Sequence, residues 1–346
     1  MSEKNGKKSD IIDVARAAKV SPSTVSRSFN HPNLVKAATR KKIERAVRKL
    51  GYIRNRAAQT IHGIRSGTIG LVVPTIDHTI FGELIQSFSQ GVDKFGFTIL
   101  LASHGYNLER EYELIRKMLE HRVDGIALIG LDHLDDTYEL LGQQNIPAVL
   151  LWNYAEQSEL PCVGSDNYQS GFLIGEHVAK LGHREIAGVF PPLQGNDRAS
   201  HRFRGVMDAL ELYGIDLPET RLLRTPYSVG AAKAAIRQML SGFERPTAII
   251  CGNDVLAWGA LHALKQLGLD APDDISVVGI GDFAGSADFE PSLTTVRIPA
   301  GAIGLKAAET IACMIKDNQT SPKSDLIQPQ LQVRKSCGFP NGVQKR

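Results

Sequence analysis

Residues 13–30 read Asp13-Val-Ala-Arg-Ala-Ala-Lys-Val-Ser-Pro-Ser-Thr-Val-Ser-Arg-Ser-Phe-Asn30, and they contain two short helical patterns joined by a tight turn. Apolar residues recur at helical spacing in both halves, as Val25 and Phe29 do in the second. Ser21 is a residue type that caps helix N-termini, and Pro22 stands at the first helical position, where its missing N–H costs nothing. The pattern predicts a helix–turn–helix.

The second of these helices is expected to have a polar outer side. Ser23, Thr24, Ser26 and Arg27 place short hydrogen-bonding groups and one guanidinium there. In helix–turn–helix units that bind DNA, the second helix enters the major groove and its N-terminal residues contact base edges. An ordinary two-helix corner would show the same pattern, so this stretch alone leaves both interpretations open.

The distribution of charge favours DNA. Residues 1–66 contain 16 Lys and Arg against 4 Asp and Glu, a net charge of +12, whereas the remaining 280 residues contain 24 against 33, a net charge of −9. A small basic segment joined to an acidic remainder is typical of proteins that bind a polyanion. A solvated basic surface is the alternative, but +12 is a high charge for a segment of this length.

Length and cysteine usage bound the class of protein. A chain of 346 residues is too long for one typical core and indicates two or three domains. The cysteines are dispersed, without a CxxC pair or a His at ligand spacing, so we expect a reducing compartment, no metal site and no cofactor. Neither a signal peptide nor an apolar run near the roughly 18 residues of a membrane span is present, which predicts a cytoplasmic protein that binds no membrane. The cysteines are Cys162, Cys251, Cys313 and Cys337.

A third helix is predicted over residues 37–50, with Ile43 and Val47 on its apolar side and basic residues on its other faces. Gly51 fits the left-handed position that ends a helix. Residues 55–62 could form one or two helical turns, but so short a helix is not stable alone in water. We therefore expect this segment to become ordered only on a partner, here DNA.

The head of the chain shares a specific set of residues with a known family. They are Asp13-Val-Ala15, Val20-Ser21, Thr24-Val-Ser-Arg27, Asn30, Thr39-Arg40, Leu50-Gly-Tyr52, Asn55 and Ala58. On these residues, the segment 9–66 resembles the DNA-binding head of the lactose-repressor/galactose-repressor family of bacterial transcription regulators, and the similarity continues through nearly the whole chain.

The resemblance implies that residues 22, 23 and 27 read operator bases. It also implies that 55–62 is a hinge helix in the minor groove at the operator centre, where Ile61 is an apolar wedge that bends the duplex. The DNA-binding residues expected on this basis are Ser21, Pro22, Ser23, Thr24, Ser26, Arg27, Asn30, Tyr52, Asn55, Ala58, Gln59 and Ile61.

Three residues of the head depart from the family pattern. Lys19 stands where the turn usually has Gly, so we expect about 1 kcal/mol of strain from a left-handed backbone there. Arg54 replaces the usual Pro before the hinge, and Ile61 replaces the usual Leu of the wedge. None of these changes removes a group that the family's DNA binding requires.

Beyond Thr68, short apolar runs alternate with helical patterns, which is typical of parallel sheets in α/β units. The predicted strands are 68–73, 97–102, 124–129, 147–151, 185–190, 247–251 and 275–280, and the predicted helices include 81–95, 108–121, 169–181, 200–213, 230–241 and 254–267. The family resemblance implies a body of two periplasmic-binding-protein-like subdomains with an effector in the cleft between them.

These patterns predict the following domain organisation. We expect a disordered basic N-terminus (1–8), a helix–turn–helix domain (9–54), a hinge (55–66), a body for effector binding and dimerisation (67–340) and a tail (341–346). Within the body, the first subdomain is expected over about 67–163 and 296–325, and the second over about 164–295 and 326–340.

Candidate effector-binding residues lie just after predicted strands, where α/β folds bind ligands, or match the family's effector site. They are Phe81, Trp152, Asn153, Arg198, Arg202, Tyr227, Asn253 and Asp282. Aromatic faces and Asn, Asp and Arg side chains suit a sugar, a sugar acid or a phosphorylated sugar. Asp254 and Phe283 also end predicted strands and are further candidates for the cleft. Trp152 is equally compatible with plain core packing, and Asp254 with a helix N-cap. Gly281 stands where many sugar-responsive members have an effector-binding Asp, which leaves open whether Asp282 replaces it.

Two rival functions are open to such a body. Gly279-x-Gly281-x-x-Ala284 nominally fits a dinucleotide fingerprint, but turn residues follow it rather than a helix, so we expect no enzyme activity and no catalytic residues. A transported-solute-binding protein would have no use for a basic DNA-binding head. We therefore predict a homodimeric repressor of a carbohydrate or sugar-acid operon that binds a palindromic operator. The segment 81–95 should form much of the dimer surface, and the tail 335–346 lacks the leucine heptads that a tetramer would use.

Overall fold

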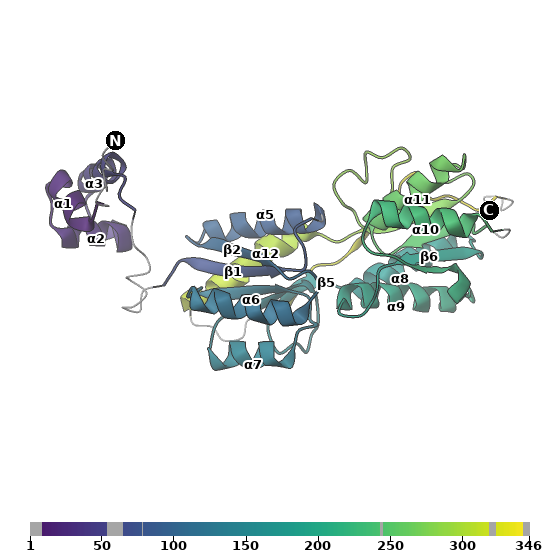
Figure 1. The fold of residues 1–346 in the computed structure, drawn as a ribbon, viewed down its shortest axis with the longest axis horizontal. Coiled ribbons are helices and arrows are strands. Elements are labelled where there is room, and N and C mark those ends of the chain that lie inside the picture. The colour runs from purple at the N-terminus through teal and green to yellow at the C-terminus, as the bar shows by residue number, and fades with distance from the viewer. Residues whose placement is uncertain (1–8, 54–64, 78, 243–244, 318–322, 342–346) are drawn as a thin grey trace, which may run out of the picture. The chain divides into compact units, whose positions relative to one another are not determined.

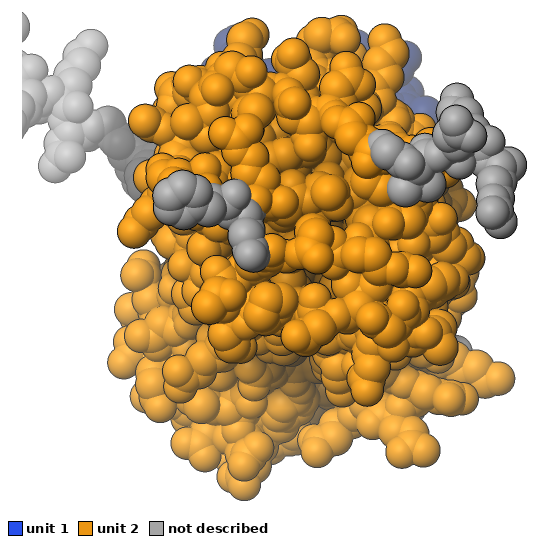
Figure 2. All heavy atoms as spheres, turned by 90° about the vertical axis from the view of Figure 1, so that its right-hand side faces the viewer, with its two compact units in different colours: residues 1–66 blue, residues 67–346 orange. Residues whose placement is uncertain are grey.

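The computed structural model describes residues 9–53, 65–77, 79–242, 245–317 and 323–341. The chain divides into two compact units, residues 1–66 and residues 67–346, which Figure 2 shows in blue and orange. The predicted hinge, with Asn55, Ala58, Gln59 and Ile61, lies outside the described residues. Within the part of the chain that is described, no helix is both long enough and apolar enough to cross a membrane.

The first unit is a bundle of three short helices with one small core. Val14, Val25 and Ile43 contribute one fully buried side chain from each helix, and Ala15 and Ala46 fill the space between them. The elements are α1 (Ile11–Ala18), α2 (Pro22–Asn30), the 3-10 helix η1 (Pro32–Leu34) and α3 (Ala37–Leu50). The predicted helix–turn–helix and third helix are confirmed.

Local signals in the sequence set the ends of these helices. Asp10 and Asp13 form a capping box at the start of α1, and the Ser21 hydroxyl accepts from the Thr24 N–H at the start of α2. Lys19 ends α1 with a left-handed backbone (φ 56°, ψ 47°), and Gly51 ends α3 at φ 59°. Lys19 therefore has the left-handed backbone on which the expected strain depends. Gly51 has the same backbone conformation without strain, because glycine has no Cβ atom.

The second unit, which is the body, contains two six-stranded sheets, and the first has the order β11-β5-β4-β3-β1-β2 with all neighbours parallel. Helices α5 and α12 pack on one face of this sheet, and α6 and α7 lie on the other (Figure 1). The elements are β1 (Thr68–Val73), α5 (Thr79–Asp93), β2 (Thr98–Ser103), α6 (Leu108–Glu120), β3 (Gly125–Ile129), α7 (Asp135–Gln143), β4 (Ala148–Asn153), β5 (Cys162–Ser165), α12 (Ala300–Asp317) and β11 (Asp325–Leu326).

The second sheet has the order β12-β10-β9-β8-β6-β7, parallel except for the β10–β12 pair. Helices α8 and α9 cover one face, and α10 and α11 the other (Figure 1). The elements are α8 (Asn167–Lys180), β6 (Ile186–Phe190), α9 (Asp197–Leu212), η2 (Glu219–Arg221), β7 (Leu222–Arg224), α10 (Val229–Leu240), β8 (Ala248–Cys251), α11 (Asp254–Gln266), β9 (Ser276–Gly281), β10 (Thr294–Arg297) and β12 (Gln330–Gln332). All seven predicted strands are present, and the predicted fold class is confirmed.

The chain passes between the two sheets three times. The first passage follows Ser165, the second follows Arg297, and the third lies between β11 and β12. The first two expected boundaries, after 163 and before 296, are too early by about two residues. The reason is that β5 pairs with β4 through Ser165, and β10 pairs with β9 through Arg297. We refer below to the half built on the first sheet as the first subdomain and to the other half as the second subdomain.

Two histidines of the second subdomain, the buried His183 and the half-buried His177, make the stability of the body dependent on pH. Burial, with the nearby His183 and Lys180, lowers the pKa of His177, and burial lowers the pKa of His183 more than its hydrogen bond to the Gly338 carbonyl raises it. The folded state therefore takes up protons less readily than the unfolded state. As pH falls below the ordinary value of 6.5, the unfolded state binds more protons and stability decreases.

We predict that the Tm of the chain falls by a few degrees between about pH 7 and pH 5.5, and that His177→Gln reduces this fall. Calorimetry over a pH series measures the slope. His262→Gln is the matched control, because His262 is exposed on α11. A wild-type slope in the His177 variant would show that its imidazole does not contribute.

Candidate effector-binding site and DNA-binding surface

The second helix of the first unit presents three predicted DNA-binding residues to solvent. Pro22, Ser23 and Arg27 are exposed, whereas Val25 on the opposite side is buried in the core. The Ser21 hydroxyl lies 2.8 Å from the hydroxyls of Ser23 and Thr24, so these groups form one polar cluster at the start of α2. A convex helix with this exposed side has the shape and chemistry to enter a major groove.

The other predicted DNA-binding residues that the structure describes in this unit also make contacts within the unit. Ser26 accepts a hydrogen bond from the Asn30 amide at 3.4 Å. Tyr52 is half-buried and stacks on Phe29, with ring centroids 6.4 Å apart. Exposed basic side chains on α3 add positive charge to the same unit, namely Lys41, Lys42, Arg45, Arg48 and Lys49.

In the body, residues from both subdomains meet in a small inner cavity of about 30 Å³. Its lining contains six of the eight predicted effector residues. The lining residues are Phe81, Tyr106, Trp152, Arg198, Arg202, Tyr227, Asn253, Ile280, Gly281, Phe283 and Ile298. The cavity is about the size of one water molecule, because side chains fill most of the space between the subdomains.

Close packing of α8 on α9 positions Arg202. A Cβ atom at Gly171 would lie 1.9 Å from the Arg202 carbonyl oxygen, and one at Gly205 would lie 2.0 Å from the Tyr168 carbonyl oxygen. Only glycine at both positions allows the helices to approach this closely. The backbone that carries Arg202 is thereby held against α8.

The guanidinium of Arg202 is buried, with 6% of the residue exposed, and its described partners are neutral. It donates to the Asn167 Oδ1 at 3.1 Å and to the Tyr227 hydroxyl at 3.1 Å, and its Nε has no hydrogen-bond partner among the described residues. A buried cation without a carboxylate partner is costly. An anionic or polyhydroxylated ligand in this cavity would reduce that cost.

Arg198, one helical turn earlier, is charge-compensated instead. Its Nη1 donates to the Asp197 carboxylate at 2.8 Å and to the Ile129 carbonyl at 3.2 Å. Burial alone would raise the pKa of Asp197, but the Arg198 guanidinium and N–H donors from Leu131, Arg198 and Asn153 lower it below its ordinary value. Asp197 is therefore a carboxylate, and the pair is neutral as a whole.

Aromatic rings form the walls of the site. Phe81 and Trp152 have ring centroids 5.4 Å apart, and Trp152 reaches this position with a left-handed backbone (φ 82°) at the end of β4. Tyr106 and Tyr227 face each other with centroids 6.2 Å apart. The left-handed conformation of a bulky residue is costly and is concentrated at functional sites in proteins.

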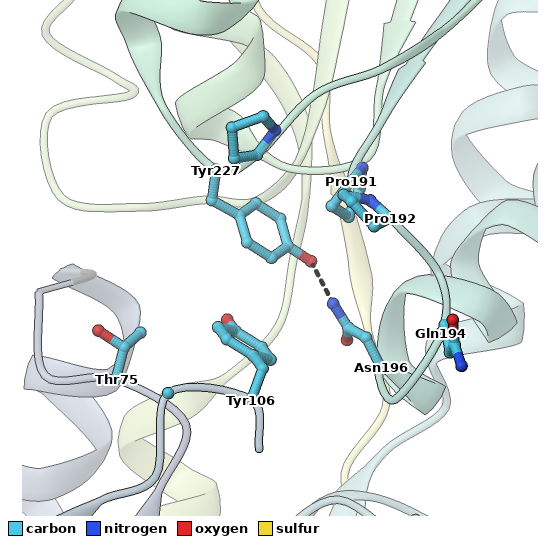
Figure 3. A pocket seen from close by; sticks show the side chains of 9 residues that line it. Thr75, Tyr106, Pro191, Pro192, Gln194, Asn196 and Tyr227 are labelled. Atoms are coloured by element: carbon cyan, nitrogen blue, oxygen red, sulfur yellow. Dashed lines mark hydrogen bonds between the residues drawn. The ribbon is translucent and has the colours of Figure 1, made fainter.

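A larger outer cavity of about 410 Å³ adjoins the inner one and shares Tyr106 and Tyr227 with it. Figure 3 shows the Tyr227 ring beside Pro191 and Pro192, the Tyr106 ring below it, and Asn196 donating to the Tyr227 hydroxyl. Its volume is in the range of small-molecule sites. The lining residues are Thr75, Gly105, Tyr106, Pro191, Pro192, Gln194, Asn196, Pro226 and Tyr227.

Two predicted effector residues lie elsewhere. Asp282 does not line either cavity, because its carboxylate bridges Arg297 (Nε, 2.6 Å) and Arg334 (Nη2, 2.6 Å). Its role in effector binding therefore stays a prediction, without support from the cavity linings. Asn153 also lies outside both linings and bonds with its side chain to Asp197 and Asn167.

The structure also explains the glycine at position 281. A Cβ atom there would lie 2.0 Å from the ring of Phe283, so no aspartate fits while this ring occupies the site. Asp254 holds the Phe283 backbone in place, because its buried carboxylate accepts from the Phe283 N–H at 2.8 Å and from Ser286 and Thr295. Asn253, not Asp254, is the N-cap of α11.

Several lining residues are not among the predicted ones, and Tyr106 and Asn196 are the polar ones that bond or pack against Tyr227. Asp197 was not predicted either; it lines neither cavity but bonds to Asn153 and Arg198 beside them. Asn196 and Asp197 immediately precede Arg198, and Tyr106 follows the end of β2, so their position after strands was a usable signal. Phe283 follows a predicted strand, as Asp282 does, but nothing in the sequence indicates which of these two neighbours lines the cavity.

Comparison with known proteins agrees with this geometry. Residues 10–55 match the model of the bacterial regulatory proteins of the lacI family, and residues 176–337 match a periplasmic binding protein-like domain. The HTH-type transcriptional repressor PurR of Escherichia coli O1:K1 is 30% identical over 328 residues, which cover 94% of this chain and 96% of PurR.

Two solved structures extend the similarity to the whole fold. The lac repressor dimer bound to operator and the anti-inducer ONPF is 27% identical, with a TM-score of 0.83 over 96% of this chain and 100% of that one. A complex of the transcriptional regulator CelR with cellobiose is 26% identical, with a TM-score of 0.69 over 95% and 99% of the two chains.

Proposed function

Because the chain belongs to the LacI family of bacterial regulatory proteins, we propose that it is a homodimeric repressor that binds a palindromic operator and is controlled by a small molecule in its cleft. It acts by binding and not by catalysis. The observation that carries the proposal is the combination of two sites in one chain: an exposed helix with Pro22, Ser23 and Arg27, and a cleft around the buried Arg202.

The DNA-binding part of the proposal assigns base reading to Arg27, together with Pro22 and Ser23. A guanidinium can donate two hydrogen bonds to one guanine in the major groove, and such a contact discriminates strongly between bases. The basic residues on α3 would contact phosphates, which carry no sequence information. Dimerisation would place two such helices on two half-sites of a palindrome.

We predict that Arg27→Ala weakens binding to the selected operator by about 1–3 kcal/mol and relaxes the base preference at one position of each half-site. Selection from randomised DNA, followed by binding titrations at fixed salt, measures both effects. Arg48→Ala is the matched control, because it removes an equal charge from α3 and should weaken all sequences alike. An unchanged base preference in the Arg27 variant would contradict the assignment.

For the effector, we propose a sugar acid or a phosphorylated sugar, with a neutral sugar as the alternative. The neutral partners of Arg202 leave its charge available for a carboxylate or phosphate, and the proline and tyrosine walls suit the C–H faces of a sugar ring. The similar CelR is described with a disaccharide, which supports a carbohydrate. A thermal-shift screen of sugar acids, sugar phosphates and neutral sugars tests the class, since a ligand of the folded state raises the Tm.

The homodimer is supported by one similar protein and by the surface of the body. The lac repressor is described as a dimer on its operator. In this chain, Leu101 on the edge strand β2 and Leu305 on α12, which packs on α5, are large apolar side chains that remain exposed. A mass of two chains by light scattering is the expected result, whereas a mass of four chains would contradict it.

A further inference from the structure

The start of α9 bonds across the cleft to the first subdomain. The Asp197 carboxylate, in the second subdomain, accepts from the Leu131 N–H at 2.8 Å and from the Asn153 amide. Its neighbour Arg198 donates to the Ile129 carbonyl at 3.2 Å. Three hydrogen bonds thus connect two consecutive residues of one subdomain to the loop after β3 and the end of β4 in the other.

These bonds are shielded from water, which makes them energetically important. The side chain of Asp197 is 10% exposed and that of Arg198 is 7% exposed. In such surroundings a charge that loses its partners remains costly. Opening of the cleft would separate the Asp197 carboxylate from two N–H donors at once, so these contacts oppose opening.

The loop that receives these bonds is built for close approach. Gly130 has φ 98°, and a Cβ atom at this position would lie 2.2 Å from the Arg198 Nη1. Any other residue would push the Arg198 side chain away from the Ile129 carbonyl. Gly130 therefore permits the contact between the two subdomains.

A buried cluster of three ionisable side chains lies behind the same loop. Glu111 is within 2.6 Å of the His133 Nδ1 and 3.4 Å of the His104 Nε2, and all three side chains are buried. The other ring nitrogen of His133 lies 3.2 Å from the Gly130 carbonyl, which can only accept. His133 therefore donates through Nε2 to the Gly130 carbonyl, while its Nδ1 is held 2.6 Å from the Glu111 carboxyl group. These two contacts fix the loop between Ile129 and Leu131.

We propose that Asp197 and Arg198 form a latch between the two subdomains, and that Glu111 and His133 are positioning residues that hold the loop in the geometry the latch requires. The latch sets the free energy of cleft opening. An effector in the cleft then changes the conformation of the body by strengthening or replacing these bonds. This last consequence rests on the proposed function, but the latch itself does not.

Hydrogen exchange at the Leu131 amide reports the latch directly, because this N–H is donated to Asp197. In the full chain without DNA or added ligand, Asp197→Asn should accelerate exchange at Leu131 by about tenfold or more, since it removes the charge that holds the bond. Glu211→Gln is the matched control, because Glu211 is an exposed acid on the same helix. The amide of Val278, in a central strand of the second sheet, should be unaffected by either change.

Two results would overturn the latch. Exchange at Leu131 could stay at the wild-type rate in Asp197→Asn, or exchange at Val278 could rise by the same factor, which would mean a general loss of stability. Either result leaves the proposed function intact, because neither measurement uses operator or effector.

A double variant tests the positioning role of Glu111. If Glu111 acts through the latch, Glu111→Gln accelerates exchange at Leu131 in the wild type but adds nothing in the Asp197→Asn background. An equal acceleration in both backgrounds would show that Glu111 supports the loop independently of Asp197, and it would remove Glu111 and His133 from the proposal.

Discussion

A chain that begins at Gly67 should bind no operator DNA at all, yet it should fold and bind ligand as the full chain does. Removal of residues 1–66 takes away the helix–turn–helix and the net charge of +12, and leaves a body with a net charge of −9. The body would then lose non-specific binding as well, because phosphate contacts by basic residues supply most of that binding. The expected effect is complete loss, beyond that of any single substitution in α2.

The body should still fold after this truncation, because its own backbone contacts begin at Gly67 and Thr68. β1 starts at Thr68 and pairs with both β2 and β3, and the Gly67 N–H is bonded to Asp124 at 2.6 Å. Fluorescence anisotropy with labelled operator at about 0.15 M salt measures DNA binding. An unchanged Tm and thermal shift with the screened ligands are the controls. Operator binding by the truncated chain would refute the assignment of DNA binding to residues 1–66 and favour a DNA-binding surface on the body.

Much of the first unit was predictable because its determinants are local. Ser21, Pro22 and Gly51 each set a helix end through a bond or a backbone conformation within a few residues in sequence. The left-handed Lys19 was predictable for the same reason, although from the family pattern and not from residue type. Three short amphipathic helices then leave few ways to build one core.

The elements that the sequence did not reveal depend on distant partners. β5, β7, β10, β11 and β12 are two to four residues long, and short strands carry almost no periodic signal. Their conformation follows from pairing with a longer neighbour, as β10 pairs with β9. The two passages between subdomains were therefore placed two residues too early, since the predicted boundaries relied on turn residues alone.

In the candidate site, too, contacts between residues distant in sequence decide features that the sequence does not reveal. Asp282 has the chemistry of an effector ligand and follows a strand, but Arg297 and Arg334 lie far along the chain and draw its carboxylate away. Phe283 occupies the space instead because Gly281 leaves room for its ring. Position after a strand, together with the family pattern, selected six residues that line the same cavity, and only the three-dimensional arrangement of charges decides which of Asp282 and Phe283 faces it.

Arg202→Ala is expected to abolish the response to effector while leaving operator affinity within about twofold of the wild type, since it lies in a unit separate from the helix–turn–helix. The guanidinium is buried, is held by Asn167 and Tyr227, and has no carboxylate partner among its described contacts. An acidic effector would lose its charge-assisted hydrogen bonds, which are worth roughly twice neutral ones.

Two measurements are made on the same protein. The first is operator affinity by fluorescence anisotropy, with and without the ligand that gives the largest thermal shift. The second is the thermal shift that this ligand produces. Arg204→Ala is the matched control, because Arg204 is an exposed residue of the same helix that lies over the Tyr168 ring. It should keep both the thermal shift and the change in operator affinity. If Arg202→Ala also kept them, the effector would have to be held elsewhere, and the outer cavity between Tyr106 and Tyr227 would become the site to test. Loss of both responses in Arg202→Ala alone, with operator affinity retained, would place the effector at the buried guanidinium and separate sensing from DNA binding within one chain.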